Sequence, residues 1–315
     1  MTEHFLSKDL YRGGFSAQHE PVLTVTAGAG DRITFETDDE AYAQMEQVRD
    51  LSRVTAQLNP ITGPLYVEGA EPGDALAVTI HDIALAEHGW SVFLPGAGAL
   101  QRAMGEEMFV RRVPLQGGRA QLTKDLDCPI APMIGCIGVA PRTSEASTVM
   151  PSYPTGGNMD LTDVAPGATV YLPVQVHGAL LYIGDIHAVM SRGESSFVAI
   201  ESAGRATVSV DVIKGRTLDA PHVDTGTEYV CVGLGNPVQD SIQMAYESLF
   251  SVLTNEHGWS KEDAYVIMSA MAHTELGGPT GSQDPDPLHP FRPIGSVTLA
   301  RIKKDLLSIG SPAGN

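Results

Sequence analysis

Alternating apolar and polar residues predict that the chain folds mainly into β-strands. The clearest example is the segment 75–85, which follows a turn. Leu76, Val78 and Ile80 fall on one face of it and the residues between them on the other, as in a half-buried strand. Residues 22–36 contain two shorter runs of this kind around a glycine-rich turn, so we expect a β-hairpin there.

Two segments in the middle of the chain predict central strands of one β layer. Residues 170–183 form an apolar run, and valines alternate with polar residues over 206–213, patterns typical of buried and half-buried strands. From about 88 to 130, glycine and proline are dense and the apolar periodicity is weak. We therefore expect long loops in that stretch, with one strand around 108–110.

Apolar residues at helical spacing predict a few helices. Strong helix formers over 38–58 indicate a helical insertion in the β-rich part. In the last third, Asn236 is placed to cap a helix over 236–258, and Ser260, three residues before an aspartate, is placed to start a second one. A last strand is expected around 294–302.

These elements predict a mainly β fold, with sandwich-like or barrel-like layers and α/β decoration in the C-terminal third. We expect three regions along the chain. They are 1–150, β-rich with the helical insertion; 151–235, a central β region with the candidate metal site; and 236–315, a helix pair with the final strand.

Composition and charge remove several classes of function. The chain has 315 residues, 43% of them apolar and 18% charged, which is typical of a folded globular protein. Its formal net charge of -18 would repel a phosphate backbone or an anionic lipid surface, so we expect neither a nucleic-acid nor a membrane partner. Three cysteines without CxxC spacing, and an N-terminus without a basic and then apolar leader, favour a cytoplasmic protein. Motifs for phosphate loops, zinc-protease helices and serine-hydrolase elbows do not occur.

The densest group of metal-capable side chains lies between residues 156 and 201. Asp185 and His187 are two positions apart, so in an extended segment they point to the same side and could share one ion. Asp160 follows a glycine-rich stretch and could complete a three-ligand site that leaves one position open for water. The same Asp-x-His pair is also common in structural turns, and both interpretations stay open at this point.

Three further residues have both a functional and a structural interpretation. Glu68 lies between Val67 and Gly69, where an apolar wall would raise its pKa and make it a general base. Cys136 is either a nucleophile or, as a free cysteine in an apolar strand, a small buried hydrophobe. His177, inside an apolar run, is either a reserve ligand or a hydrogen-bonded core residue.

Five segments resemble the acetamidase/formamidase family in sequence, order and spacing. They are NPITGPLYVEGAEPGD (59–74), PMIGCIGVAP (132–141), GGNMD (156–160), LPVQVHGALLYIGDIHA (172–188) and VAIE (198–201). The likeness extends over roughly residues 20 to 275, and motifs of this length are specific. Glu194 and Glu201 are in register with the same pattern.

This resemblance implies an enzyme that hydrolyses a small amide, such as formamide or acetamide, to a carboxylate and ammonia. It also implies a mostly β fold and a cytoplasmic homo-oligomer that contains a divalent metal ion. For that ion we expect zinc, with calcium as the alternative. The family is separate from the nitrilase-type amidases, whose catalytic Cys, Glu and Lys set is not found in this sequence.

Two departures from the family pattern concern the substrate side. An early family element, an Asp followed five residues later by Gln, is similar to Asp39 and Gln44, which we expect to bind substrate. The small residues usually between them are replaced by Glu-Ala-Tyr-Ala at 40–43. The family's Gly-Asp-Gly-Glu is similar to Ser-Arg-Gly-Glu at 191–194. Arg192 thus puts a cation where the family has a carboxylate, so either a second metal site is lost or Arg192 binds an anion of the substrate.

The leading hypothesis is metal-assisted amide hydrolysis. The residues expected to hold the ion are Asp160, Asp185 and His187. The ion lowers the pKa of its water and polarises the carbonyl group. Glu68 or Glu194 would take the proton of the water and pass it to the leaving nitrogen, and Asn158 or main-chain N–H groups would stabilise the oxyanion.

Three alternatives remain at this stage. The first is an amidase with Cys136 as its nucleophile. The second is an enzyme for a larger amide, a carboxylate-bearing amide or a lactam, which the exchange at Arg192 leaves open. The third is a small-molecule binding protein that has kept the fold and lost the chemistry.

Overall fold

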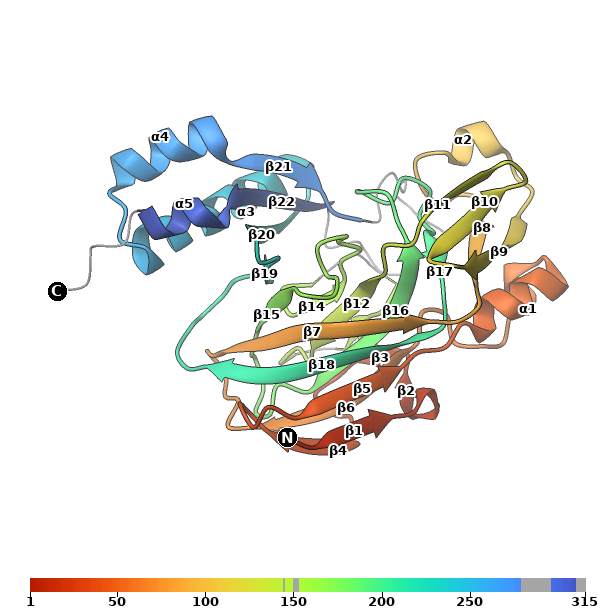
Figure 1. Ribbon diagram of the computed structural model, residues 1–315, viewed down its shortest axis with the longest axis horizontal. Coiled ribbons are helices and arrows are strands. Elements are labelled where there is room, and N and C mark those ends of the chain that lie inside the picture. Colours follow the sequence, from red (N-terminus) through yellow and green to blue (C-terminus); the bar gives the residue numbers. More distant parts are fainter. Residues whose placement is uncertain (144, 150–152, 279–295, 310–315) are drawn as a thin grey trace.

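Two large β-sheets form the body of the molecule (Figure 1). The structure is a computed structural model that describes residues 1–143, 145–149, 153–278 and 296–309. Within these residues the first sheet has nine strands. Their order is β1 (Glu3–Leu6), β5 (Arg32–Glu36), β18 (Gly204–Ile213), β7 (Ala75–Leu85), β15 (Thr169–Pro173), β19 (His222–Asp224), β20 (Glu228–Gly235), β22 (Ser296–Lys303) and β21 (His273–Leu276).

The second sheet has eleven strands in the described part of the chain. Its main path is β11 (Leu126–Pro129), β10 (Arg119–Thr123), β9 (Phe109–Gln116), β8 (His88–Phe93), β17 (Ile200–Glu201), β16 (Leu181–Val189), β12 (Met133–Val139) and β14 (Gly156–Asn158). Beside β16 lies β6 (Ile61–Glu68), which also pairs with β2 (Tyr11–Arg12) and β4 (Leu23–Thr26). A separate small pair joins β3 (Gly14–Phe15) to β13 (Ala146–Ser147).

The main hydrophobic core lies between the two sheets. Leu76, Val78 and Ile80 of β7 are fully buried there, as the alternation over 75–85 predicted. Side chains of the second sheet, such as Ile137 of β12 and Ile183 of β16, belong to the same cluster. Each such side chain contributes about 1.5–3 kcal/mol by leaving water, so the sandwich is stabilised by contacts between segments distant in sequence.

Five α-helices lie among the described residues: α1 (Glu40–Val48), α2 (Gln101–Met104), α3 (Val238–Ser251), α4 (Lys261–Met271) and α5 (Lys304–Ile309). Short helical turns occur at 8–10, 51–53 and 252–256. The helix predicted within 38–58 is α1. The longer helices α3 and α4 lie with β21 and β22 at one end of the molecule, which confirms the mainly β fold with helices in the C-terminal part (Figure 1). In the described ranges, no helix has the length and apolar character needed to cross a membrane.

The two C-terminal helices begin close to the predicted residues. Ser260 caps α4, because its side chain accepts a hydrogen bond from the N–H of Asp263 at 3.0 Å, as predicted. The preceding helix starts at Val238 with Pro237 at the cap position, so the cap is one residue later than the predicted Asn236. Residues 294 and 295 of the predicted last strand lie outside the described residues, and β22 begins at 296.

The hairpin predicted over 22–36 does not form. Its first run is β4, which pairs in parallel with β6 in the second sheet. Its second run is β5, which pairs with β1 and β18 in the first sheet. The alternation predicted both strands, but their partners are distant segments whose apolar faces fill the core between the sheets.

The run 170–183 is likewise divided between the sheets, into β15 and β16. Three successive residues in the turn between them, Gly178, Ala179 and Leu180, have φ of 74°, 57° and 60°, and they turn the chain from one sheet toward the other. His177 is exposed in this turn. It is therefore not the core residue that we expected, nor is it near the other metal-capable side chains.

The stretch 88–130 contains four strands where we expected long loops with one strand. β9 pairs antiparallel with the whole of β8, from His88 opposite Pro114 to Phe93 opposite Phe109. Gly117 and Gly118 have φ of 58° and 74°, so the glycines that indicated a loop instead form a tight hairpin turn. Strands of all three regions predicted along the chain meet in the nine-stranded sheet, and the boundaries of those regions stay a prediction.

A buried histidine connects the first sheet to α3. His222 of β19 is 2% exposed; its Nδ1 lies 3.0 Å from the Tyr229 hydroxyl and its Nε2 lies 2.7 Å from the Ser248 hydroxyl. Burial, and then the positive charge of Arg216, lowers the pKa of His222 from 6.5 to about 3. The imidazole is therefore neutral in the folded protein.

We expect His222 to make the protein sensitive to acid. Its pKa is lower in the folded than in the unfolded chain, so its contribution to stability is complete above pH 6.5 and is lost as the pH falls toward 3. Urea unfolding of the wild type between pH 7 and 4.5 should show an extra loss of up to about 1.4 kcal/mol per pH unit that is absent in His222→Gln. Equal pH slopes in the two proteins would contradict this assignment.

Candidate active site in a buried carboxylate cluster

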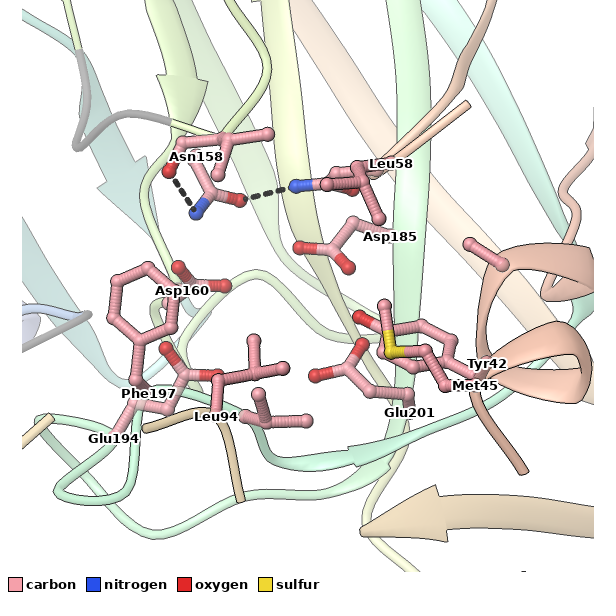
Figure 2. A pocket seen from close by; sticks show the side chains of 14 residues that line it. Tyr42, Met45, Leu58, Leu94, Asn158, Asp160, Asp185, Glu194, Phe197 and Glu201 are labelled. Carbon is pink, nitrogen blue, oxygen red and sulfur yellow. Dashed lines mark hydrogen bonds between the residues drawn. The ribbon is translucent and has the colours of Figure 1, made fainter. Parts of the chain in front are cut away.

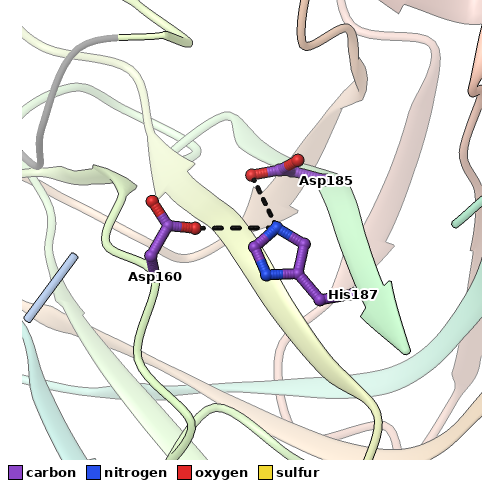
Figure 3. A group of neighbouring side chains, drawn as sticks. All are labelled: Asp160, Asp185 and His187. Atoms are coloured by element: carbon purple, nitrogen blue, oxygen red, sulfur yellow. Dashed lines mark ion pairs between the residues drawn. The ribbon is translucent and has the colours of Figure 1, made fainter. Parts of the chain in front are cut away.

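Five ionisable side chains meet in the interior of the second sheet. Asp185 and His187 come from β16, Glu201 comes from β17, Asp160 follows β14, and Glu194 lies in the turn after β16. All except Asp185 are at least nine-tenths buried. Figure 3 shows Asp160 and Asp185 pointing toward the imidazole of His187, so the structure brings the three predicted ligands together.

The Nε2 atom of His187 lies at the centre of this cluster. It is 3.2 Å from Glu201 Oε2, 3.4 Å from Asp185 Oδ2 and 3.7 Å from Asp160 Oδ1. Two ligand atoms that share a tetrahedral zinc ion, each about 2.1 Å from it, stand about 3.4 Å apart. The separations in the cluster are therefore those of atoms that could share one ion.

Among the residues that the structure describes, two groups of side chains have ligand atoms close enough to hold a metal. They are Asp160, Asp185 and His187, and His187, Glu194 and Glu201, each within 4.8 Å of one another. Both carboxylate oxygens of Asp160 and both ring nitrogens of His187 are buried without a hydrogen-bond partner. Because unpaired buried polar atoms are costly, the two oxygens of Asp160 and one ring nitrogen of His187 fit a site that binds a cation.

Gly135 of β12 leaves the space at the centre of the cluster. A Cβ atom there would lie 2.5 Å from Asp185 Oδ2, 2.6 Å from Asp160 Oδ1 and 2.9 Å from His187 Nε2. These are the same three ligand atoms, so the absent side chain of Gly135 is what keeps the space between them open.

The electrostatics of the cluster indicate an excess of negative charge. Burial, and then the charge of Asp185, raises the pKa of Asp160 well above its usual range, and burial followed by Asp160 does the same for Glu194. Burial raises the pKa of Glu201 to about 7. For His187, burial is outweighed by Glu201 and Asp185, which raise its pKa well above 6.5. For Asp185, burial is outweighed by His187, which lowers its pKa. A divalent cation would compensate this excess charge.

The cluster faces a small cavity that is lined by both polar and apolar side chains (Figure 2). The cavity encloses about 60 Å³. Four of the five acidic or basic cluster members line it, together with Asn59 and Asn158. The remaining lining residues are Ala41, Tyr42, Met45, Leu58, Leu94, Val149, Phe197 and Val198.

Backbone strain is concentrated around this cavity. Eight non-glycine residues in the described part of the chain have φ in the left-handed region, and five of them line the cavity. The five are Asn59, Asp160, Asp185, Glu194 and Phe197, with φ from 40° to 71°. Such residues cost roughly 1–3 kcal/mol each and cluster at functional sites, so the strain supports a functional assignment for the cavity.

The amino-acid sequence matches the model of a known protein family. The model of the Acetamidase/Formamidase family matches residues 18–146 and 139–278. The chain belongs to the acetamidase/formamidase family. The resemblance found in the sequence over residues 20 to 275 is thereby confirmed.

Solved structures of this family share the fold along almost the whole chain. The predicted acetamidase/formamidase from Thermoanaerobacter tengcongensis has a TM-score of 0.85 at 30% identity and covers 98% of both chains. The acetamidase from Bacillus halodurans has a TM-score of 0.86 at 29% identity and covers 98% of this chain and 100% of that one. The acetamidase of Mycolicibacterium smegmatis is 28% identical over 256 residues, 61% of this chain and 63% of that relative. This chain thus spans less than two thirds of the curated relatives that it matches.

Asn59, the first residue of the 59–74 segment, belongs to the site although sequence analysis did not single it out. Its side-chain nitrogen donates to the carbonyl oxygen of Thr148 at 2.6 Å and to Asn158 Oδ1 at 3.0 Å. Asn158 in turn donates to the Val149 carbonyl at 3.5 Å. The two amides therefore orient each other beside Asp185. The family segment 59–74 was the signal for Asn59, but no spacing rule connected it to the ligands.

The structure does not bring Glu68 to the cluster. Glu68 ends β6 at the protein surface, is exposed, and accepts a hydrogen bond from the Thr26 hydroxyl at 2.8 Å. It does not line the cavity. The side chain of the preceding Val67 is buried in the core, and the alternation of the strand turns Glu68 outward.

Asp39 and Gln44 lie behind the cavity wall instead of in it. Asp39 accepts a hydrogen bond from Trp90 Nε1 at 2.8 Å and immediately precedes α1. Gln44 Oε1 accepts from the main-chain N–H groups of Thr55 and Ala56 at 2.9 and 3.1 Å. Asp39 and Gln44, which we expected to bind substrate, therefore hold α1 and the following loop in position. Both of these segments contribute residues to the cavity lining.

Arg192 also lies outside the cavity lining. Its Nη1 atom donates to Asp163 Oδ2 at 3.1 Å and to Glu275 Oε2 at 2.7 Å. The anions that Arg192 binds in the structure are carboxylates of the chain itself, and the expected contact with an anion of the substrate stays a prediction. These partners were not visible in the sequence because Glu275 is 83 residues away.

We expect Gly135→Ala to abolish metal binding at the cluster. The new methyl group would occupy the space between three ligand atoms, so zinc retained after dialysis, measured by elemental analysis, should fall by more than about tenfold. Cys136→Ala is the matched control, because it changes the next buried residue of the same strand without adding an atom at the cluster. Stoichiometric zinc in Gly135→Ala would show that the ion binds elsewhere.

Proposed function

We propose that the protein hydrolyses a short-chain amide, such as formamide or acetamide, to a carboxylate and ammonia with the aid of a divalent metal ion. The observation that carries the proposal is the close set of ligand atoms on Asp160, Asp185 and His187 beside a cavity of about 60 Å³. The atoms of Asp160 and His187 in this set are buried without a hydrogen-bond partner. Membership of the acetamidase/formamidase family supports the reaction type. The small cavity favours a short acyl group over a lactam or a larger amide.

Asp160, Asp185 and His187 would hold the ion, and the donor set favours zinc over calcium. An imidazole nitrogen is an ordinary ligand of zinc, whereas calcium prefers an all-oxygen shell. Once bound, the ion would polarise the amide carbonyl and lower the pKa of a water molecule. The residues of the chain supply the ligands, the proton transfer and the shape of the cavity.

Glu194 and Glu201 are the proposed proton carriers. Both line the cavity on the side of the cluster, so either carboxylate could accept the proton of the attacking water. The amide C–N bond then breaks as the nitrogen receives that proton, because an unprotonated amide nitrogen is a poor leaving group. Asn158 lies in the same lining and is proposed to donate to the oxyanion.

Self-association and a cytoplasmic location accompany this proposal as predictions from the family resemblance. The exposed apolar residues Tyr265 and Val266 of α4, 70% and 64% exposed, are compatible with an interface between copies. Size-exclusion chromatography coupled to light scattering would measure the number of subunits.

Release of ammonia from formamide, acetamide and propionamide tests the proposed reaction. We expect turnover that disappears after dialysis against a chelator and returns with zinc. His187→Ala should lose the metal and lower kcat/KM by more than about 100-fold. Glu68→Gln is the control, because this exposed carboxylate lies outside the cavity and should retain activity within about twofold. Unchanged turnover in His187→Ala would falsify the metal-assisted mechanism, and a wild type that binds amides without turnover would favour the binding-protein alternative.

We expect the Cys136→Ala variant to retain its amidase activity. An amidase that used Cys136 as its nucleophile would lose it. Burial, and then the charges of Asp185 and Asp160, raises the pKa of the Cys136 thiol well above 9, so the thiolate needed for attack is not formed. The side chain packs with Phe15, Ile61 and other buried residues. Ammonia release within about threefold of the wild type is expected, and a loss of several hundredfold in a folded, metal-loaded variant would reinstate Cys136 as the nucleophile.

A further inference from the structure

Tyr42 is the one tyrosine in the cavity lining as described, and it enters from the helix side. It lies in the first turn of α1, whose residues Ala41 and Met45 line the same cavity. The start of α1 is held against the second sheet by the hydrogen bond from Trp90 to Asp39, and Trp90 pairs with Glu201 across β8 and β17. Figure 2 shows the hydroxyl end of Tyr42 directed toward the carboxylates of Asp185 and Glu201.

The hydroxyl group of Tyr42 is available to a ligand. Its main-chain N–H donates to the Asp39 carbonyl at 3.0 Å, but among the residues that the structure describes the hydroxyl has no hydrogen-bond partner. The other neutral donors of the lining are largely engaged. Both side-chain N–H groups of Asn59 donate, to Thr148 and to Asn158. One N–H group of Asn158 donates to Val149, and its second N–H group is the donor proposed above for the oxyanion. Tyr42 therefore presents an uncommitted O–H donor to a cavity whose other polar groups are mainly carboxylates.

We propose that Tyr42 contacts the substrate and determines both its orientation and the length of its acyl chain. This inference rests on the proposed amide hydrolysis and deepens it. Beside a bound cation the acids of the lining are ionised, so they can accept hydrogen bonds from the amide N–H₂ group but have no proton to donate to the carbonyl oxygen. Tyr42 supplies a donor in addition to Asn158, so the carboxamide is bound with its oxygen toward the phenol and the ion and its nitrogen toward the acids.

The same contact assists the reaction. When water adds to the carbonyl carbon, the C=O double bond becomes a single bond and its electron pair moves onto the oxygen. A hydrogen bond to that oxygen is stronger in the transition state than in the bound amide. Loss of the hydroxyl should therefore lower kcat more than it raises KM.

The ring of Tyr42 limits the space for the acyl chain. The cavity encloses only about 60 Å³. Tyr42 and Met45 close it from α1, and Leu58 and Phe197 close it from two loops. Of these four side chains, that of Tyr42 is the largest. Its removal would therefore extend the cavity beside the acyl group.

Steady-state ammonia release by the metal-loaded protein, with formamide, acetamide, propionamide and butyramide, separates the two roles. Tyr42→Phe keeps the ring, so kcat should fall about 10- to 100-fold with KM within about threefold and the order of substrates unchanged. Tyr42→Ala removes the ring, so the kcat/KM of butyramide relative to acetamide should rise by at least about tenfold. Tyr11→Ala is the control, because this tyrosine is 47% exposed on β2 and does not line the cavity; it should match the wild type.

Each outcome decides one statement. A Tyr42→Phe protein with wild-type kcat overturns the role of the hydroxyl, and this nearly isosteric variant is informative even where Tyr42→Ala fails to fold. In that case Tyr42→Leu replaces it, with the same direction of change expected. A folded small variant with the wild-type ratio of butyramide to acetamide overturns the role of the ring. An active wild type with unaffected variants rejects Tyr42 alone, whereas a wild type that releases no ammonia from any amide overturns the proposed function and this inference with it.

Discussion

The burial of four carboxylates around one imidazole is the constraint on which the rest of the structure depends. Charged groups in a protein interior are costly unless they are paired, and the one imidazole of the cluster cannot compensate four acids. Both oxygens of Asp160 and both nitrogens of His187 are left without a hydrogen-bond partner. The glycine at 135, the left-handed backbone at three of the acids and the raised pKa values are all consequences of assembling these groups at one point. A fold that tolerates this arrangement needs a large surrounding core, which the two packed sheets provide.

The C-terminal layer is coupled to the cluster by a second set of charges. Two arginines, Arg192 and Arg301, share Asp163 and Glu275, with distances of 2.6–3.1 Å for the closest contacts. Asp163 follows Asp160 by three residues and Arg192 precedes Glu194 by two, so this network joins the two turns that carry these acids. Gly278, just after β21, packs against both: a Cβ there would lie 2.7 Å from that of Asp160 and 3.0 Å from that of Glu194. The helices and strands of the last third therefore help to place the acids, although they contribute none of them.

The sequence predicted the parts of the site that depend on local geometry. The i, i+2 spacing of Asp185 and His187 is read along one strand, and Asp160 follows a turn of glycines, so their meeting could be expected. Glu68 shows the limit of this reasoning, because its apolar neighbours do not reveal that β6 reaches the surface at that residue. The local sequence also does not show which strands pair. β4 and β5 were predicted as strands that pair with each other in a hairpin, but they lie in different sheets. The partners of Arg192 are non-local for the same reason.

Different kinds of element build the two walls of the cavity, and this difference explains where Asp39 and Gln44 lie. The ligands and the glycine at their centre lie on or beside paired strands, whose hydrogen bonds fix their positions. The wall opposite is formed by α1 and the loop after it, which are held by Asp39 on Trp90 and by Gln44 on the main chain at 55 and 56. A substitution in that wall can change the shape offered to a substrate while the strands keep the ligand atoms in place. Residues 40–43, where this chain departs from its family, lie in α1 and so in the wall built by the helix and its following loop. The ligands Asp185 and His187 lie in the strand β16.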